Sequence, residues 1–159
     1  MNRKPPFAIV HTLLSLMMCL CLGCAARHEA GAPCPAIEMS AVTDTQSDSS
    51  KTVTLNDTTK ILISRTPLVA TGDITSASAS QTGDQWVVNF TVTDDAAKRV
   101  REFTQQHVGK YLALVVDGKA HGGTPRIAGA VVSNRYELDG LDRADAERVA
   151  TAVSNGCRR

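Results

Sequence analysis

The sequence predicts an α+β fold in which two helices pack on a small antiparallel sheet. Apolar runs with alternating polar residues recur between turn signals, and two segments carry apolar residues at helical spacing behind a capping residue. The order along the chain is strands, helix, strands, helix. With 159 residues, the chain has the length of one domain of this class.

The first 23 residues have the layout of an export signal. Arg3 and Lys4 precede an apolar run over residues 8–22, and small residues follow at 23–26. The run is shorter than the ~20 residues that a membrane-spanning helix needs. We therefore expect residues 1–23 to be a cleaved signal peptide; a retained membrane anchor is the alternative.

The segment 20–25 (LCLGCA) resembles the bacterial lipobox, in which a small residue precedes a cysteine that becomes the acylated N-terminus. Gly23 and Cys24 fit this pattern, whereas Cys21 stands where leucine is usual. We expect Cys24 to carry the acyl chains, palmitate included, and to anchor the protein to a membrane of the cell envelope, facing the periplasm. Ala25 favours the outer over the inner membrane by the sorting rule of enteric bacteria. Cleavage one or two residues later would instead release a soluble protein.

The remaining cysteines form an even pair. Cys19 and Cys21 leave with the signal and Cys24 takes the lipid, so Cys34 and Cys157 remain in an oxidising compartment. We expect a Cys34–Cys157 disulfide that ties the two ends of the domain together; two unpaired thiols are the alternative. No metal site is expected, because the histidines of the mature chain show no ligand spacing.

Residues 24–51 are predicted to be a flexible tether, followed by a folded domain over residues 52–159. Glycine and prolines lead into the polar tract 43–50, which has little apolar surface to bury. Alternation over residues 52–55 and an apolar run at 60–63 predict the first two strands.

A hairpin and a helix are predicted next. Residues 74–92 form two strand patterns around the turn Thr82-Gly83-Asp84. Thr93 is expected to cap a helix that ends near Gly109, and the acids at 94 and 95 complement the helix dipole. The predicted apolar stripe of this helix comprises Ala97, Val100, Phe103 and Thr104.

The last third of the chain predicts strands and a second helix. Residues 111–116 are a buried strand pattern, Asp117-Gly118 is a tight turn, and a glycine-rich loop spans residues 122–125. Two extended pieces and a helix follow, over residues 127–132, 135–138 and 142–156. The buried side of this helix, which Asp142 caps, is predicted to comprise Ala146, Val149, Ala150 and Val153.

A series of motifs in this order matches a known family. They are the strand 90–92, Thr93-Asp94, the helix 98–103, Val108-Gly109-Lys110, the strand 112–116, Asp117-Gly118-Lys119, Pro125, Val131, Gly140 and the helix 146–153. Residues 60–156 thereby resemble the head subdomain of the first periplasmic domain of SecD, a subunit of the bacterial protein-export motor. The pattern departs from the family at a longer loop before Pro125 and at Ser133-Asn134, which replaces a glycine pair.

The resemblance implies a head module that touches or captures polypeptide emerging on the periplasmic side. SecD couples proton flow to movement through a membrane bundle, and no segment of this sequence corresponds to one. The motor activity is therefore not part of the expectation.

We expect neither an enzyme nor a cofactor site, because no catalytic constellation is present. The net charge of +1, with one Trp, two Tyr and three Phe, also argues against nucleic-acid binding. The favoured hypothesis is a membrane-tethered binding module that holds exported or unfolded polypeptide, or the export machinery, along a strand edge or groove. An envelope protein that binds one folded partner is the alternative. The oligomeric state stays open.

The predicted polypeptide contacts are Trp86, His121, Gly122, Gly123 and Pro125. For Trp86, packing at a strand start is the competing interpretation. His121 and the glycines lie in a loop, where a surface role is the competing interpretation.

Overall fold

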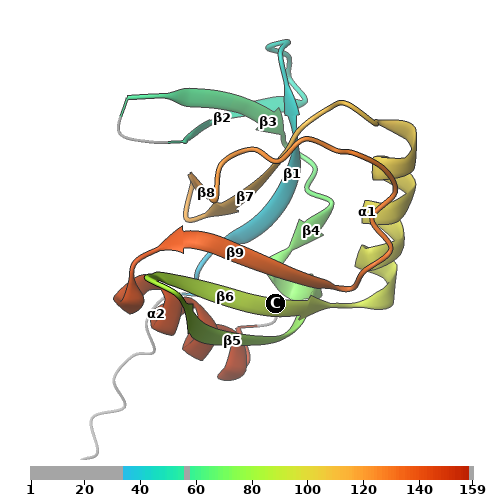
Figure 1. The fold of residues 1–159 in the computed structure, drawn as a ribbon. Coiled ribbons are helices and arrows are strands. Elements are labelled where there is room, and N and C mark those ends of the chain that lie inside the picture. The colour runs from blue at the N-terminus through green and yellow to red at the C-terminus, as the bar shows by residue number, and fades with distance from the viewer. Residues whose placement is uncertain (1–33, 56–57, 158–159) are drawn as a thin grey trace, which may run out of the picture. The chain divides into compact units, whose positions relative to one another are not determined.

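The computed structural model describes residues 34–55 and 58–157 (Figure 1). The predicted signal peptide, Cys24 and the first part of the predicted tether lie outside the described residues. Six strands form a mixed sheet: β1 (Ile37–Thr43), β2 (Ser50–Thr54), β3 (Lys60–Ser64), β4 (Val69–Ala70), β7 (Leu112–Val116) and β8 (Lys119–His121). Three more form an antiparallel sheet in the order β5-β6-β9: β5 (Ile74–Thr82), β6 (Gln85–Val92) and β9 (Arg135–Leu141).

The helices are α1 (Asp94–Gln106) and α2 (Arg143–Ser154), and a short 3-10 helix (Thr71–Asp73) joins β4 to β5. The α+β class is therefore confirmed. Where the sequence patterns indicated one antiparallel sheet, the strands divide between two, and β2 pairs with β8 in parallel. The predicted hairpin is present as β5–β6.

β1 corrects the predicted tether. The tether prediction over residues 24–51 is wrong from Ile37 onward, because this segment is a strand with neighbours on both sides. β1 pairs antiparallel with β7 from Ile37 to Ala41, and with β4 and β3 along its other side. Ile37 and Met39 are buried at 4% and 3% exposure, so β1 is part of the core rather than a spacer.

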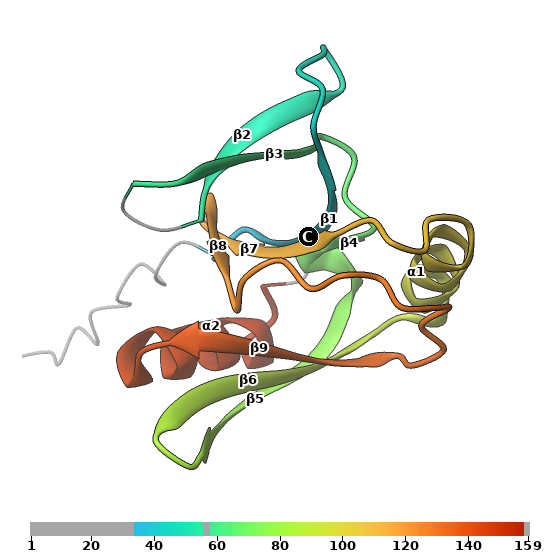
Figure 2. The same ribbon diagram turned by 45° about the horizontal axis from the view of Figure 1, so that its top comes forward.

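Pairing of β1 with β3 closes five strands into a ring. The pairs run β1-β3-β2-β8-β7 and return to β1, an arrangement visible in Figure 2. Inside the ring lies a small apolar cluster of Val53, Ile63, Ala113, Val115 and Ala120. Alternation along β1 places Ser40 on the same inner face as Val42, and the buried Ser40 Oγ has no hydrogen-bond partner in the described part of the chain.

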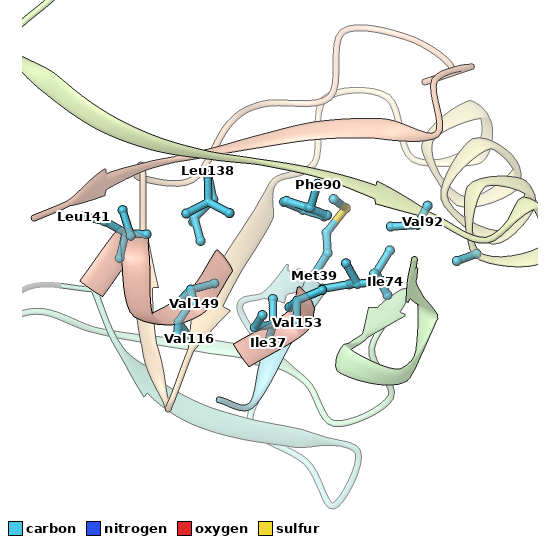
Figure 3. Close-up of a cluster of buried hydrophobic side chains, with 14 of the residues drawn as sticks. Ile37, Met39, Ile74, Phe90, Val92, Val116, Leu138, Leu141, Val149 and Val153 are labelled. Carbon is cyan, nitrogen blue, oxygen red and sulfur yellow. The ribbon is translucent and has the colours of Figure 1, made fainter. Parts of the chain in front are cut away.

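The larger core lies between the two sheets and the helices (Figure 3). Ile37, Met39 and Val116 of the six-stranded sheet share this cluster with Phe90 and Leu138 of the three-stranded sheet, and α2 adds Val149 and Val153. Burial of this apolar surface is the main favourable contribution to folding.

Both helices begin at the capping residues predicted from the sequence. The Thr93 side chain accepts a hydrogen bond from Ala96 N, and Asp142 accepts one from Asp145 N. In α2 the buried residues are the four that were predicted. In α1 they are Ala96, Val100 and Thr104, so Ala96 takes the place predicted for Ala97, and the helix ends at Gln106 rather than near Gly109.

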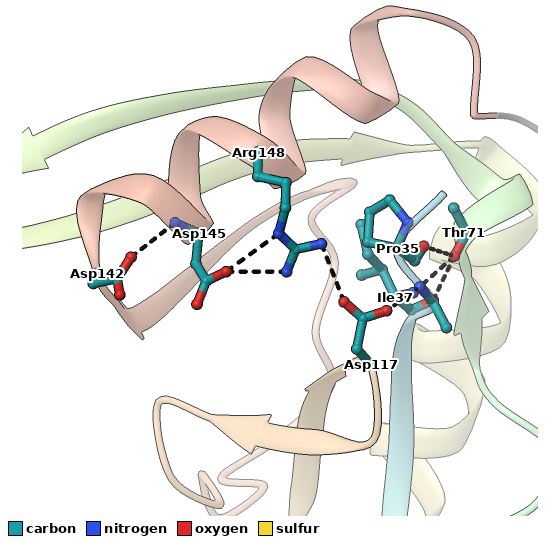
Figure 4. Close-up of polar contacts among 8 residues, drawn as sticks. Pro35, Ile37, Thr71, Asp117, Asp142, Asp145 and Arg148 are labelled. Atoms are coloured by element: carbon teal, nitrogen blue, oxygen red, sulfur yellow. Dashed lines mark hydrogen bonds and ion pairs between the residues drawn. The ribbon is translucent and has the colours of Figure 1, made fainter. Parts of the chain in front are cut away.

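The start of β1 is fixed by contacts from three distant segments. Cys34 forms the predicted disulfide with Cys157, across 5.5 Å between Cα atoms and 123 positions of sequence. Thr71 Oγ1 accepts from Ile37 N at 2.8 Å and donates to the Pro35 carbonyl at 3.1 Å (Figure 4). Asp117 Oδ1 accepts from the Ala36 backbone N–H at 2.9 Å.

Asp117 also links β1 to α2. It lies in the predicted tight turn between β7 and β8, with φ of 51° followed by 83° at Gly118, the positive angles that a two-residue hairpin turn requires. Its second carboxylate oxygen accepts from Arg148 at 3.1 Å, and Arg148 also donates to Asp145 (Figure 4). Burial lowers the pKa of Arg148, but the hydrogen bonds that it donates to Asp145 and Asp117 outweigh burial, and the net pKa is raised.

Thr104 joins α1 to the segment before β9. Residues 127–132, predicted as extended, are irregular instead. Ile127 holds this segment by backbone hydrogen bonds, accepting from Gly109 N and donating to the Lys110 carbonyl. Thr104 is fully buried; its hydroxyl donates to the Val100 carbonyl at 2.8 Å and accepts from Val131 N at 2.9 Å. One side chain thus satisfies a partly buried backbone group of the irregular segment.

Replacing Cys34 and Cys157 with serine is expected to lower the free energy of unfolding by about 2–5 kcal/mol, because the unfolded chain gains freedom over a long loop. Urea unfolding followed by the fluorescence of Trp86 measures the change. Wild-type protein treated with a reductant is the matched control and should show the same loss. Equal stability of all three samples would contradict the structural role of the disulfide.

Thr104→Val is expected to lower the free energy of unfolding by about 1 kcal/mol, because the partly buried Val131 N–H loses its acceptor. Thr104→Ser retains the hydroxyl and serves as the control, with a smaller loss. The same urea experiment compares the two variants. A valine variant as stable as the serine variant would show that the hydroxyl contributes nothing.

Candidate functional site

An apolar groove lies between β9 and the irregular segment 125–131. It encloses about 620 Å³. Met39 of β1, Val100 of α1, and Leu112 and Leu114 of β7 contribute to its lining. The remaining lining residues are 125–131, Tyr136 and Glu137. Segments from five parts of the chain therefore build one apolar surface.

The backbone of β9 faces this groove. Val92 N donates to the Asn134 carbonyl at 2.9 Å, which shows that Val92 of β6 directs its N–H toward the β9 side. By the alternation of antiparallel pairs, Phe90 does the same toward its partner Tyr136. The next residue, Glu137, then directs its backbone N–H and C=O away from β6. Since Glu137 also lines the groove, one side of the groove offers a strand edge with main-chain donor and acceptor groups.

Tyr136 is held in place at the groove. Its ring stacks on Phe90 with 5.6 Å between centroids, and its hydroxyl donates to the Ser133 carbonyl at 2.9 Å. Burial raises the pKa of Tyr136 above its ordinary value, so the hydroxyl stays protonated and keeps its donor role near neutral pH. The groove wall is therefore uncharged at this position.

The predicted contact residues do not gather in one place. Pro125 lines the groove, and its carbonyl accepts from Leu112 N at 3.0 Å. His121 and Gly122 lie instead beside the far end of β9, where His121 Nδ1 is 3.2 Å from the Gly140 carbonyl. Gly123 is exposed and does not line the groove.

Trp86 also lies near the far end of β9, as the β6 partner of Leu141. It is partly buried against the core, and the Arg143 guanidinium lies 5.2 Å from its ring centre. Packing and a cation–π contact therefore account for its position.

The close approach of β8 and β9 explains two glycines. Gly122 has φ of 65° and Gly140 has φ of 72°, and a Cβ on Gly140 would lie 3.0 Å from Gly122 N. A Cβ on Gly122 would overlap the Asp139 side chain. The predicted contact role of Gly122 thus coincides with a backbone requirement.

Sequence reasoning missed the floor of the groove. The sequence places Met39 in the predicted tether, and Leu112 and Leu114 in a predicted buried strand with no sign of a groove. Only the apolar, small-residue run over 127–131 carried a local signal. Among residues 34–55 and 58–157, no three His, Cys, Asp or Glu side chains gather as a metal would require, and no helix has the length and apolarity to span a membrane.

Comparisons with known proteins agree with this fold. A family model described as "SecDF, P1 head subdomain" matches residues 44–157. A protein translocase subunit SecD of Thermobaculum terrenum is 34% identical over 93 residues, which cover 57% of this chain and 18% of that protein. A protein translocase subunit SecDF of Thermus thermophilus is 32% identical over 94 residues, covering 57% of this chain and 12% of the relative. The chain thus spans less than a fifth of the length of these relatives.

Solved structures show the same fold. One, titled "Structure and function of a membrane component SecDF that enhances protein export", aligns over 77% of this chain and 63% of its own with a TM-score of 0.58 and 22% identity. SecDF in a super-membrane-facing form aligns over 77% of this chain and 19% of its own, with a TM-score of 0.57 and 23% identity. The resemblance noted from the motifs is confirmed: the chain belongs to the family of the SecDF P1 head subdomain.

Proposed function

We propose that this protein is a non-catalytic binding module that holds extended polypeptide in the groove beside β9. The observation that carries the proposal is the combination of an apolar floor with the outward backbone groups of Glu137. An extended chain added to a strand edge gains main-chain hydrogen bonds that do not depend on its sequence, while apolar side chains enter the groove. Such binding suits unfolded chains of many sequences.

The relatives support a role in protein export. They are translocase subunits, and one SecDF is described as enhancing protein export. The polypeptide held in the groove is then an exported chain on the periplasmic side, or a segment of the export machinery. No cofactor takes part, because binding of this kind needs only the backbone edge and the apolar floor.

The proposal includes the N-terminal anchor. The lipobox-like segment before Cys24 is the support, together with the expected removal of residues 1–23. An acylated Cys24 would hold the domain at a membrane surface of the envelope, with the outer membrane favoured. Residues 25–33 would then link the lipid to the disulfide at Cys34.

The groove is tested by Ala130→Glu. Ala130 is exposed and lines the groove, so a carboxylate there must lose water when an apolar segment binds. We expect about tenfold weaker binding of a fluorescein-labelled, reduced and carboxymethylated α-lactalbumin, measured by fluorescence anisotropy. Gln105→Glu adds the same charge on an exposed face of α1 away from the groove and should bind like the wild type.

Two outcomes would contradict the groove proposal. One is wild-type protein that does not bind the unfolded polypeptide. The other is equal binding by the Ala130→Glu and Gln105→Glu variants, which would place the contact elsewhere.

The anchor is tested by mass spectrometry of protein purified from bacterial cells that express the full-length chain. The expected species begins at Cys24 and carries the mass of a diacylglyceryl group and an N-linked acyl chain. Cys24→Ala should abolish both the acylation and the membrane retention. A mature protein that begins beyond residue 24, or an unmodified Cys24, would exclude the lipid anchor.

A further inference from the structure

β5 lies at the border of the three-stranded sheet, on the side opposite to β9. Among the residues that the structure describes, it pairs with β6 alone in the order β5-β6-β9, and Figures 1 and 2 draw no strand beyond it. Its nine residues make it the longest strand among the described residues. Helix α2 packs on one face of the hairpin, mainly against β5, while residues 78 and 80–82 of the strand are exposed.

The outward backbone groups of β5 follow from the same alternation that fixes β9. Since Phe90 of β6 directs its backbone to β9, Asn89 directs its own to β5, where its partner is Ser78. The residues on either side of Ser78 then point outward with both N–H and C=O. These outward residues are Ala77, Ala79 and, two further along, Gln81.

Between Ala77 and Gln81 this edge lacks the features that usually prevent strand addition, because the register irregularity of β5 lies at its start, between Ile74 and Ser76. Residues 75–82 (TSASASQT) contain no charge and no proline, and residues 75, 76, 78 and 80–82 are exposed. Natural edge strands are usually blocked by lysine, proline or a bulge. A weak contact reaches one outward group, from Ser154 Oγ to the Ala77 carbonyl at 3.5 Å. A carbonyl has two lone pairs, so this contact leaves room for a second donor.

We propose that two copies of this chain associate through β5, edge to edge and antiparallel, around a two-fold axis near Ala79. Each copy then offers the other the same alternation of donors and acceptors, as an isologous interface requires. Ala77 lies opposite Gln81 of the partner subunit, and Ser78 opposite Ser80 of the partner subunit. The strand brings no charge to this interface, so the two copies place no like charges face to face.

A second copy fits this edge better than the polypeptide proposed for the groove. The groove offers apolar lining for side chains, whereas β5 presents serines on its exposed face and alanines beside α2. Small side chains of this kind hold no anchor for a foreign chain, but they let two identical strands approach closely. The pairing joins the three-stranded sheets of both copies into one continuous sheet and leaves the β9 edge of each copy open.

The test is the mass of the protein in solution, measured by light scattering over a range of concentrations on protein from cells that express the full-length chain. Wild-type protein should reach the dimer mass as concentration rises. The double variant Ser78→Lys/Ser80→Lys faces lysines across the two-fold axis and should dimerise at least about tenfold more weakly, as should Ser78→Glu/Ser80→Glu. Gln105→Lys/Gln106→Lys places the same charge on exposed α1 positions and should dimerise like the wild type.

A mixture separates this interface from other causes of association. Equal amounts of the lysine and glutamate variants should restore the dimer as a mixed species, because opposite charges then face each other. Wild-type protein that stays monomeric would overturn the proposal and leave β5 to another partner. Dimers that persist in both charged variants would overturn it as well, since association would then use another surface.

Discussion

The pairing of β1 on both of its sides is the constraint on which the rest of this domain depends. β1 closes the five-stranded ring by meeting β3 and β7, and it carries β4 at its start. Its outer face gives Ile37 and Met39 to the core shared with the three-stranded sheet. Removing this strand would open the ring and expose both apolar clusters, because β1, like β7, borders each of them.

The ends of the domain are tied to this strand. The disulfide joins Cys34, shortly before β1, to Cys157, shortly after α2. Asp117 connects the same region to the β7–β8 turn and to Arg148. α2 in turn packs on β5 and β6. The floor of the groove lies on the side of Met39 and Leu114, and its other wall is an irregular segment held through Thr104 and through backbone hydrogen bonds of Pro125 and Ile127.

Local sequence patterns predicted much of the fold but few of the residues that line the groove. Thr93 and Asp142 predict the starts of their helices, because a capping side chain binds a backbone N–H three residues further on. Asp117-Gly118 predicts its turn, because these residues tolerate the positive φ angles that the turn requires. β1 was missed although Ile37, Met39 and Ala41 alternate with polar residues as in a strand, because glycine and prolines before it and the polar tract after it indicated a tether. Its order depends on distant partners such as Val116, which local patterns do not show. The groove could not be predicted from local patterns either. Pro125 was identified, but the residues that form the floor come together only in the folded chain.

The central claim is that extended polypeptide lies along β9. Hydrogen–deuterium exchange of individual backbone amides, with and without a saturating unfolded polypeptide, tests it most directly. The claim predicts that the Glu137 amide, which points into the groove, becomes protected on binding, together with the amides of the 127–131 segment. Protection confined to another surface, such as α1, with Glu137 exchanging at its unbound rate, would contradict it.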